Sequence, residues 1–206
     1  MQVKPKTIEI DDSGTGDLVG DAFIGFHIIE TGEIIFRGIP VGMYNKDNHK
    51  NRKSFEYILD MVKSGLKSLN FNKKHDTIQI CRGNCFDLVR EWFDEERIKH
   101  EPAIVEGKLQ DAVEGRFIDH LRKLGVKSPN LTTEAGIKRF FVLFNWVARD
   151  LASREKYVKT GFPSWEKRWR ETAHKKSRMR NNHTSSEKKA LRKQINERAN
   201  EILNVV

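Results

Sequence analysis

Residues 8–25 read I-E-I-D-D-S-G-T-G-D-L-V-G-D-A-F-I-G, and this segment contains the pattern from which the architecture can be predicted. A short β-type run ends in two adjacent carboxylates, Asp11 and Asp12, and a glycine-rich turn leads into a second apolar run. Adjacent strand residues point to opposite faces, but the turn at residues 13–16 can rotate one acid back toward the other. Carboxylates at a strand end suit a hard divalent cation. A plain hairpin turn is the alternative, since Asp, Ser and Gly are common turn residues.

Length and composition indicate one sizeable domain, or one domain with a helical extension, because the chain has 206 residues. Hydrophobic residues make up 37% and charged residues 33%. No apolar run approaches the ~18 residues of a transmembrane helix, so no membrane partner is expected. The N-terminus leads directly into a strand, and the two cysteines, Cys81 and Cys85, are too few for a disulfide scaffold. A reduced, cytoplasmic location is the expectation.

The positive charge is concentrated in the second part of the chain. Residues 1–120 carry 17 Lys and Arg against 21 Asp and Glu, whereas residues 121–206 carry 21 against 8. This asymmetry predicts that acids of the first part bind metal and that bases of the second part bind phosphate. The alternative is a basic region that serves only solubility.

Periodicity and turn signals predict alternating strands and helices after the first strand. The pattern places strands at 22–29, 33–41, 77–81 and 102–105, and helices at 54–69, 86–98 and 109–124. Gly125 is the expected C-cap of the last of these helices. The order βββαβαβα over residues 7–125 predicts an α/β core. His27, inside an apolar strand, is expected to be structural and not a metal ligand.

Residues 126–206 differ from this core and predict a basic, helical C-terminal region. Apolar residues at helical spacing predict a helix at 137–157, and a final, mostly charged helix is expected at 186–206. Trp165 and Trp169 lie four apart; packing in the core is the favoured interpretation for both, and stacking on an unpaired base is the alternative. Removal of residues 159–206 is expected to leave residues 1–158 folded but to weaken nucleic-acid binding. The residues expected to contact nucleic acid are Lys167, Arg168, Arg170, Lys175, Lys176, Arg178 and Arg180.

The opening motif resembles that of the type 2 ribonucleases H, which begin with a strand, D-E-x-G-x-G and a second strand. Asp11, Asp12, Gly14 and Gly16 carry the match, with Asp17 and Gly20 matching more loosely, although Asp12 stands where the family usually has Glu. The order βββαβαβα is also similar to that of the wider ribonuclease H-like superfamily. The resemblance implies a mixed five-stranded sheet with helices on both faces.

The resemblance further implies a metal-dependent nuclease that uses two divalent cations, Mg²⁺ or Mn²⁺, to activate water and stabilise the leaving oxygen. Asp11 is the candidate ligand that bridges both metals, and Asp12 is the second. Asp111 and Glu114 resemble the acid pair that resolvase-type members place at the start of a helix; first-turn helix stabilisation is the alternative. Glu106, after the fifth strand, is a further candidate metal ligand.

One position departs from the type 2 pattern. Arg82 precedes Gly83-Asn84 where the family has an acid, and an arginine cannot coordinate a cation. The third acid therefore stays open among Glu56, Asp60, Asp87, Glu106 and Asp111.

Two functions are compatible with the sequence. The first is a nuclease acting on RNA, an RNA–DNA hybrid or structured DNA. The second is a catalytically degenerate module that binds nucleic acid or a protein, with Arg82 replacing the metal by pairing with Asp11 or Asp12. An actin-like phosphotransferase is disfavoured because only one glycine-rich loop is present.

Overall fold

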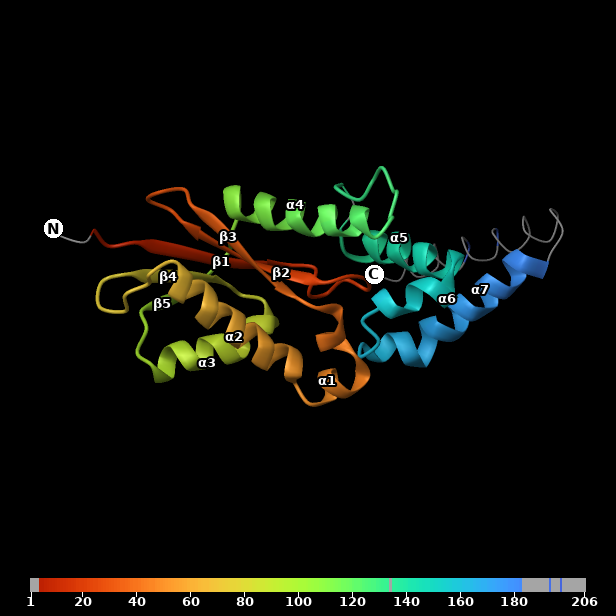
Figure 1. Cartoon of the computed structure of the whole chain (residues 1–206), viewed down its shortest axis with the longest axis horizontal. Coiled ribbons are helices and arrows are strands. Elements are labelled where there is room, and N and C mark those ends of the chain that lie inside the picture. Colours follow the sequence, from red (N-terminus) through yellow and green to blue (C-terminus); the bar gives the residue numbers. More distant parts are fainter. Residues whose placement is uncertain (1–3, 134, 183–192, 194–196, 198–206) are drawn as a thin grey trace.

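A five-stranded mixed sheet forms the centre of the molecule (Figure 1). The computed structural model describes residues 4–133, 135–182, 193 and 197. The strands are β1 (Thr7–Ser13), β2 (Ala22–Ile28), β3 (Ile34–Ile39), β4 (Thr77–Cys81) and β5 (His100–Ala103), in the spatial order β3-β2-β1-β4-β5. β1, β2 and β3 are antiparallel neighbours, whereas β4 and β5 run parallel to β1. The predicted α/β class with a mixed five-stranded sheet is confirmed.

One face of the sheet is apolar because alternate residues of the inner strands are isoleucine and phenylalanine. Ile8 lies opposite Ile28 and Ile10 opposite Phe26, and all four are buried. The helices α2 (Lys53–Ser68) and α3 (Asp87–Glu95) cover this face, preceded by the short helix α1 (Lys46–Lys50). Gly65 lets α2 come close, since a Cβ there would lie 2.4 Å from the Phe26 ring.

The helix α4 (Lys108–Lys123) covers the opposite face, so helices lie on both faces as predicted. It packs against Gly25 of β2, where an added Cβ would lie 2.8 Å from Leu109. Gly125 ends the helix with a left-handed φ of 91°, and the Val126 amide donates to the Leu121 carbonyl at 3.0 Å. The predicted C-cap is therefore confirmed.

The remaining helices gather beyond the end of the sheet at which β1 finishes (Figure 1). These are α5 (Gly136–Arg149), α6 (Leu151–Arg154) and α7 (Arg170–Asn182), with a π-helical turn at Trp165–Trp169 before α7. The single helix predicted at 137–157 is wrong, because the chain leaves helical geometry at Asp150, with φ −153° and ψ 70°. The apolar periodicity continues across this break into α6, so sequence spacing did not reveal it.

The C-terminal helices share a hydrophobic core with the sheet domain. Leu18 and Val19 from the turn after β1 pack with α4, with α5 and with Trp165, which has no exposed surface. Val19 and Val158 also form an isolated β-bridge. The favoured interpretation of Trp165 as a core residue is confirmed. The expectation that residues 1–158 fold without the remainder must be revised, because truncation there removes this core residue.

The final helix expected at 186–206 lies outside the described residues, apart from positions 193 and 197. In the described part of the chain, every helix is too short or too polar to cross a bilayer.

We expect two glycine-to-alanine substitutions to change the stability in opposite directions, because one glycine is tightly packed and the other is open to solvent. Gly65→Ala should destabilise the protein by about 1–3 kcal/mol, because the Phe26 ring is fully buried and cannot yield. Gly115→Ala should stabilise it by about 0.5–1 kcal/mol, because α4 is open at that position and alanine favours helix. Urea unfolding of both variants measures the difference, and equal shifts would contradict the packing described here.

We also expect truncation after Val158 to unfold the protein or lower its melting temperature sharply. Loss of a buried tryptophan side chain alone costs about 3–5 kcal/mol, a large share of the stability of a typical domain. Truncation after Asn182 is the control, since it keeps all of the buried side chains described above. Thermal melts that coincide for both truncations and the full chain would contradict a shared core.

Candidate functional site

Two carboxylates and a thiol converge at the end of the central strand. Asp11 and Asp12 are the fifth and sixth residues of β1, and Cys81 is the last residue of the neighbouring parallel strand β4. One carboxylate oxygen of each aspartate and the Cys81 sulfur all lie within 4.8 Å of one another. The two acids named from the sequence therefore do meet, but both lie within β1, which stays paired with β2 up to Ser13, and not in a turn that rotates one of them.

Hydroxyl and thiol groups hold the two acids in place. The Thr15 hydroxyl donates to Asp12 Oδ2 at 2.5 Å, and the Cys85 thiol donates to Asp12 Oδ1 at 3.2 Å. Burial raises the pKa of Cys81 to about 11 and also raises the pKa of Cys85. Both thiols, which are free cysteines, therefore stay protonated near neutral pH and act as hydrogen-bond donors.

Asp11 is a buried acid whose environment disfavours its charge. Only 7% of the residue is exposed, and burial raises its pKa above the usual value. The hydrogen bond from Cys81 lowers this pKa in part, whereas the nearby charges of Asp12 and Glu114 raise it further. A cation bound here would compete with a proton for Asp11, so its affinity should increase with pH.

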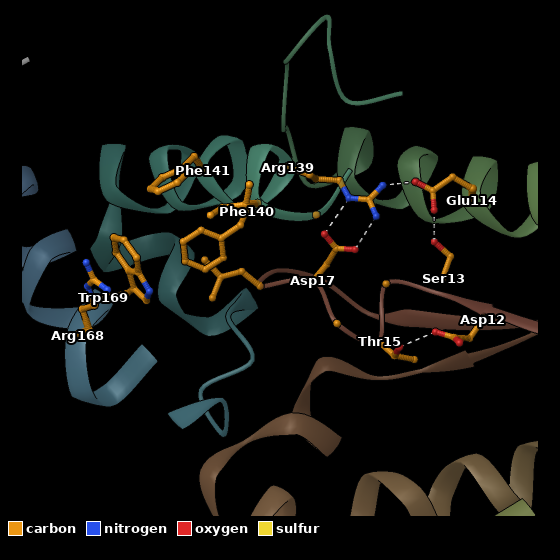
Figure 2. Close-up of a pocket in the computed structure, with 15 residues that line it drawn as sticks. Asp12, Ser13, Thr15, Asp17, Glu114, Arg139, Phe140, Phe141, Arg168 and Trp169 are labelled. Atoms are coloured by element: carbon orange, nitrogen blue, oxygen red, sulfur yellow. Dashed lines mark hydrogen bonds and ion pairs between the residues drawn. The ribbon is translucent and has the colours of Figure 1, made fainter. Parts of the chain in front are cut away.

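An arginine from α5 bridges two more carboxylates beside this group (Figure 2). Arg139 Nε and Nη2 donate to the two oxygens of Asp17 at 2.8 and 3.0 Å, and Arg139 Nη1 donates to Glu114 Oε1. The Ser13 hydroxyl donates to the other Glu114 oxygen at 2.5 Å. Burial alone would lower the pKa of Arg139, but Asp17 and Glu114 outweigh it and raise this pKa. Arg139 is thus a charged, nearly buried bridge.

A second cation reaches the same turn from the C-terminal region. Lys159 has no exposed surface, and its ammonium donates to the Gly14 carbonyl and lies 4.5 Å from the centroid of the Tyr44 ring. Burial lowers the pKa of Lys159 to about 8, although the charges of Asp17 and Asp12 oppose this shift. Gly14 itself has a left-handed φ of 85°, and α4 packs so closely that a Cβ there would lie 2.6 Å from Phe117.

The structure does not bring the other candidate acids into this group. Glu106 is exposed before the start of α4, Asp111 is exposed in the first turn of that helix, and Asp60 is exposed on α2. Asp87 pairs with Arg90, and Glu56 pairs with Lys53. Their proposed roles as ligands remain untested predictions.

Arg82 and His27, both singled out from the sequence, lie in different surroundings. Arg82 is exposed, and among the described residues it makes no ion pair with Asp11 or Asp12. His27 is buried and pairs with Glu9 across β1 and β2 at 2.6 Å, which confirms it as a structural histidine.

The predicted basic residues divide into paired and exposed side chains. Arg170 pairs with Glu155 at 2.6 Å, Lys175 pairs with Glu171 at 2.7 Å, and Lys176 donates to Asn145. Lys167, Arg168 and Arg178 are exposed, and the Arg180 side chain lies outside the description. Arg168 lines an open cleft that begins at Asp12 and Ser13 and ends at Trp169 (Figure 2).

Sequence reasoning missed Arg139, Lys159 and the two thiols. Arg139 gave no clear signal, since it stands beside Lys138 at the start of the apolar helical run. Lys159 gave none, because one lysine among many basic residues carries no local sign of burial. No family model matches this chain, and no curated protein matches it either.

We expect Lys159 to give the protein a distinctive dependence of stability on pH. The pKa of this group falls from 10.5 in the unfolded chain to about 8 in the folded one, so between these values the unfolded chain binds more protons. Stability should therefore rise with pH in this window. Compared with Lys159→Met, the wild type should gain roughly 2 kcal/mol between about pH 7 and about pH 9.5.

Urea unfolding of both proteins at the two pH values measures this gain. Groups that do not interact with Lys159 titrate alike in wild type and variant, so their contributions cancel in the comparison. Parallel pH dependence of the two proteins would show that Lys159 is not buried as a cation.

Proposed function

We propose that this protein is a metal-dependent nuclease with a ribonuclease H-like core, acting on RNA, an RNA–DNA hybrid or structured DNA. The observation that carries the proposal is the convergence of Asp11 and Asp12 at the carboxyl end of the central strand. The strand order β3-β2-β1-β4-β5, with an antiparallel meander followed by parallel strands, supports the proposed likeness to that superfamily.

The donor set suits one hard cation. Mg²⁺ is usually held by one or two carboxylates, and water and substrate phosphate complete its coordination. Asp11 and Asp12 supply the two carboxylates, and Mn²⁺ accepts the same oxygen ligands. The protonated Cys81 thiol is a poor ligand for either ion, so it serves as a donor to Asp11.

The bound cation would supply a polarised phosphate and an acidified water. The chain's own residues hold the geometry: Thr15 and Cys85 fix Asp12, Cys81 donates to Asp11, and the backbone of the glycine turn forms one wall of the cleft. Glu114 lies within electrostatic range of Asp11 but is bound by Ser13 and Arg139. A second cation would therefore need Glu114 to leave these partners, or substrate oxygens in its place.

The binding-only alternative keeps one specific observation in its favour. The position that faces Asp11 from β4 is occupied by a thiol and not by a third carboxylate, and Arg139 neutralises Glu114. The version in which Arg82 replaces the metal gains no support, because Arg82 is exposed and makes no ion pair with the two aspartates in the described part of the chain.

We expect the full-length protein to cleave labelled substrates with Mg²⁺ or Mn²⁺ and Asp11→Asn to abolish cleavage. Loss of a ligand that supports several kcal/mol of transition-state stabilisation should reduce the rate on the order of 100-fold or more. Asp111→Asn, also an acid-to-amide change but at an exposed site, should retain near wild-type activity. The assay compares hybrid, duplex and branched substrates.

The two variants and a binding assay separate the proposals. If the wild type cuts no better than Asp11→Asn, the nuclease proposal fails. Tight binding of the same substrates without cleavage would then favour the degenerate module. A loss in Asp111→Asn equal to that in Asp11→Asn would mean that α4 contributes the third ligand.

A further inference from the structure

The cleft that Asp12 lines extends well beyond the two aspartates, and its far end carries chemistry that the metal site does not use. The whole cleft has a volume of about 650 Å³, within the range of ligand pockets. At one end lie Asp12, Ser13 and Glu114, and at the other lie Phe141, Arg168 and Trp169 (Figure 2). A ligand that spans the cleft therefore meets carboxylates at one end and aromatic rings at the other.

The far end presents an aromatic wall. The Trp169 ring centroid lies 5.1 Å from that of Phe140 and 5.7 Å from that of Phe141, and the last pair is nearly perpendicular. All three rings are half-buried, so their packing fixes the wall but leaves part of each ring accessible. Ile137, on the same wall, is 42% exposed despite its size. Accessible rings held rigid by neighbours are suited to stacking.

A cation lies against this wall. The Arg168 guanidinium lies 4.9 Å from the centroid of the Trp169 ring, which is a cation–π distance. Within the described ranges of the chain, no carboxylate pairs with Arg168, whereas Arg139 at the other end is committed to Asp17 and Glu114. Arg168 is thus the cation of the cleft that can receive a phosphate.

We propose that this aromatic compartment, formed by Phe140, Phe141, Arg168 and Trp169, binds an unpaired nucleobase of single-stranded nucleic acid, with Trp169 as the stacking surface and Arg168 on the adjoining phosphate. Bases expose a ring face only where they are unstacked, so a regular duplex cannot use the wall. The strongly basic character of residues 121–206 favours a polyanion over a peptide or an apolar small molecule.

Binding of an unpaired base would select the substrate of the proposed nuclease, and this role in catalysis rests on the proposed function. One continuous cleft joins the two ends, so a strand with its base on Trp169 would bring a nearby phosphate to the end lined by Asp12, which lies next to Asp11. The preferred substrates would then be single strands, frayed ends or junctions with unpaired nucleotides.

Binding without cleavage tests the inference. We expect the full chain carrying Asp11→Asn to bind a fluorescein-labelled single strand of about 12 nucleotides, measured by anisotropy, and Trp169→Leu to weaken this binding about 10- to 100-fold. Binding of the matching blunt duplex should change little. Trp92→Leu is the matched control, because Trp92 is also half-buried under a cation, with Lys63 Nζ 5.0 Å from its centroid, but lies on α3.

A second pair of variants tests the phosphate contact. Arg168→Ala should reduce single-strand affinity and the slope of log affinity against log salt by about 0.7, the amount expected for one phosphate contact on a single strand. Lys138→Ala, which removes an exposed cation of α5 that does not line the cleft, should leave tight single-strand binding in place.

An abasic scan keeps the test independent of whether a variant folds. Removal of each base in turn from the labelled strand should weaken binding to the parent protein sharply at one or two positions and little elsewhere. A flat scan overturns the inference, as does equal weakening of single strand and duplex by Trp169→Leu. If the abasic scan depends on position but the wild type does not cleave, base binding by the compartment stands and the proposed nuclease activity is rejected.

Discussion

The ion pair between Arg139 and Asp17 is the contact on which the site depends. It joins residues 122 positions apart in the chain and fastens the glycine turn after β1 to the first turn of α5. The Asp17 amide donates to the Gly14 carbonyl at 3.2 Å, and Thr15 between them donates to Asp12. Displacement of the turn would therefore move a partner of one proposed metal ligand as well as a wall of the cleft.

This ion pair is costly to break but is not by itself a large source of stability. Two nearly buried charges lose much of their hydration, and their attraction often does no more than offset that cost. Loss of one partner is different, because it leaves a buried charge alone at a cost of about 3–5 kcal/mol. Lys159 adds a second buried cation on the same turn. The C-terminal region thus belongs to the site and is not an appendage to it.

The part of the fold that sequence predicts well is the part with local patterns. β1 and its two acids, the alternation of strands and helices, and the Gly125 cap all leave spacing signals within a few residues. Arg139 and Lys159 leave no such signal, because Asp17 and Gly14, the partners that hold them at the turn, lie more than a hundred residues away. The break at Asp150 was also hidden, since apolar spacing alone does not report a change of backbone direction.

Strand alternation explains why Arg82 proved less important than its sequence position indicated. In β4, Ile80 points into the core under α2 and α3, so the next residue, Cys81, points to the face of Asp11. Arg82 follows the end of the strand and reaches solvent. The resemblance at Gly83-Asn84 therefore pointed to Arg82, whereas the residue that faces the acids is Cys81, one position earlier.

The path of α4 explains why Asp111 and Glu114 differ despite lying on one side of the helix. Lys108, at its start, donates to the Gly32 carbonyl in the turn between β2 and β3, far along the sheet from the end of β1. The helix then runs toward that end, so Glu114 reaches Ser13 one turn after Asp111. Spacing of three residues predicts a shared side correctly but does not say which turn meets the site.

The balance of charge around the turn limits what can bind there. Four carboxylates, those of Asp11, Asp12, Asp17 and Glu114, lie close to two cations, Arg139 and Lys159, and burial already disfavours the charge of Asp11 and of Lys159. A phosphate that approached alone would meet excess negative charge in a poorly hydrated setting. A divalent cation between Asp11 and Asp12 would remove that excess, so phosphate and cation should bind together and each should strengthen the affinity of the other.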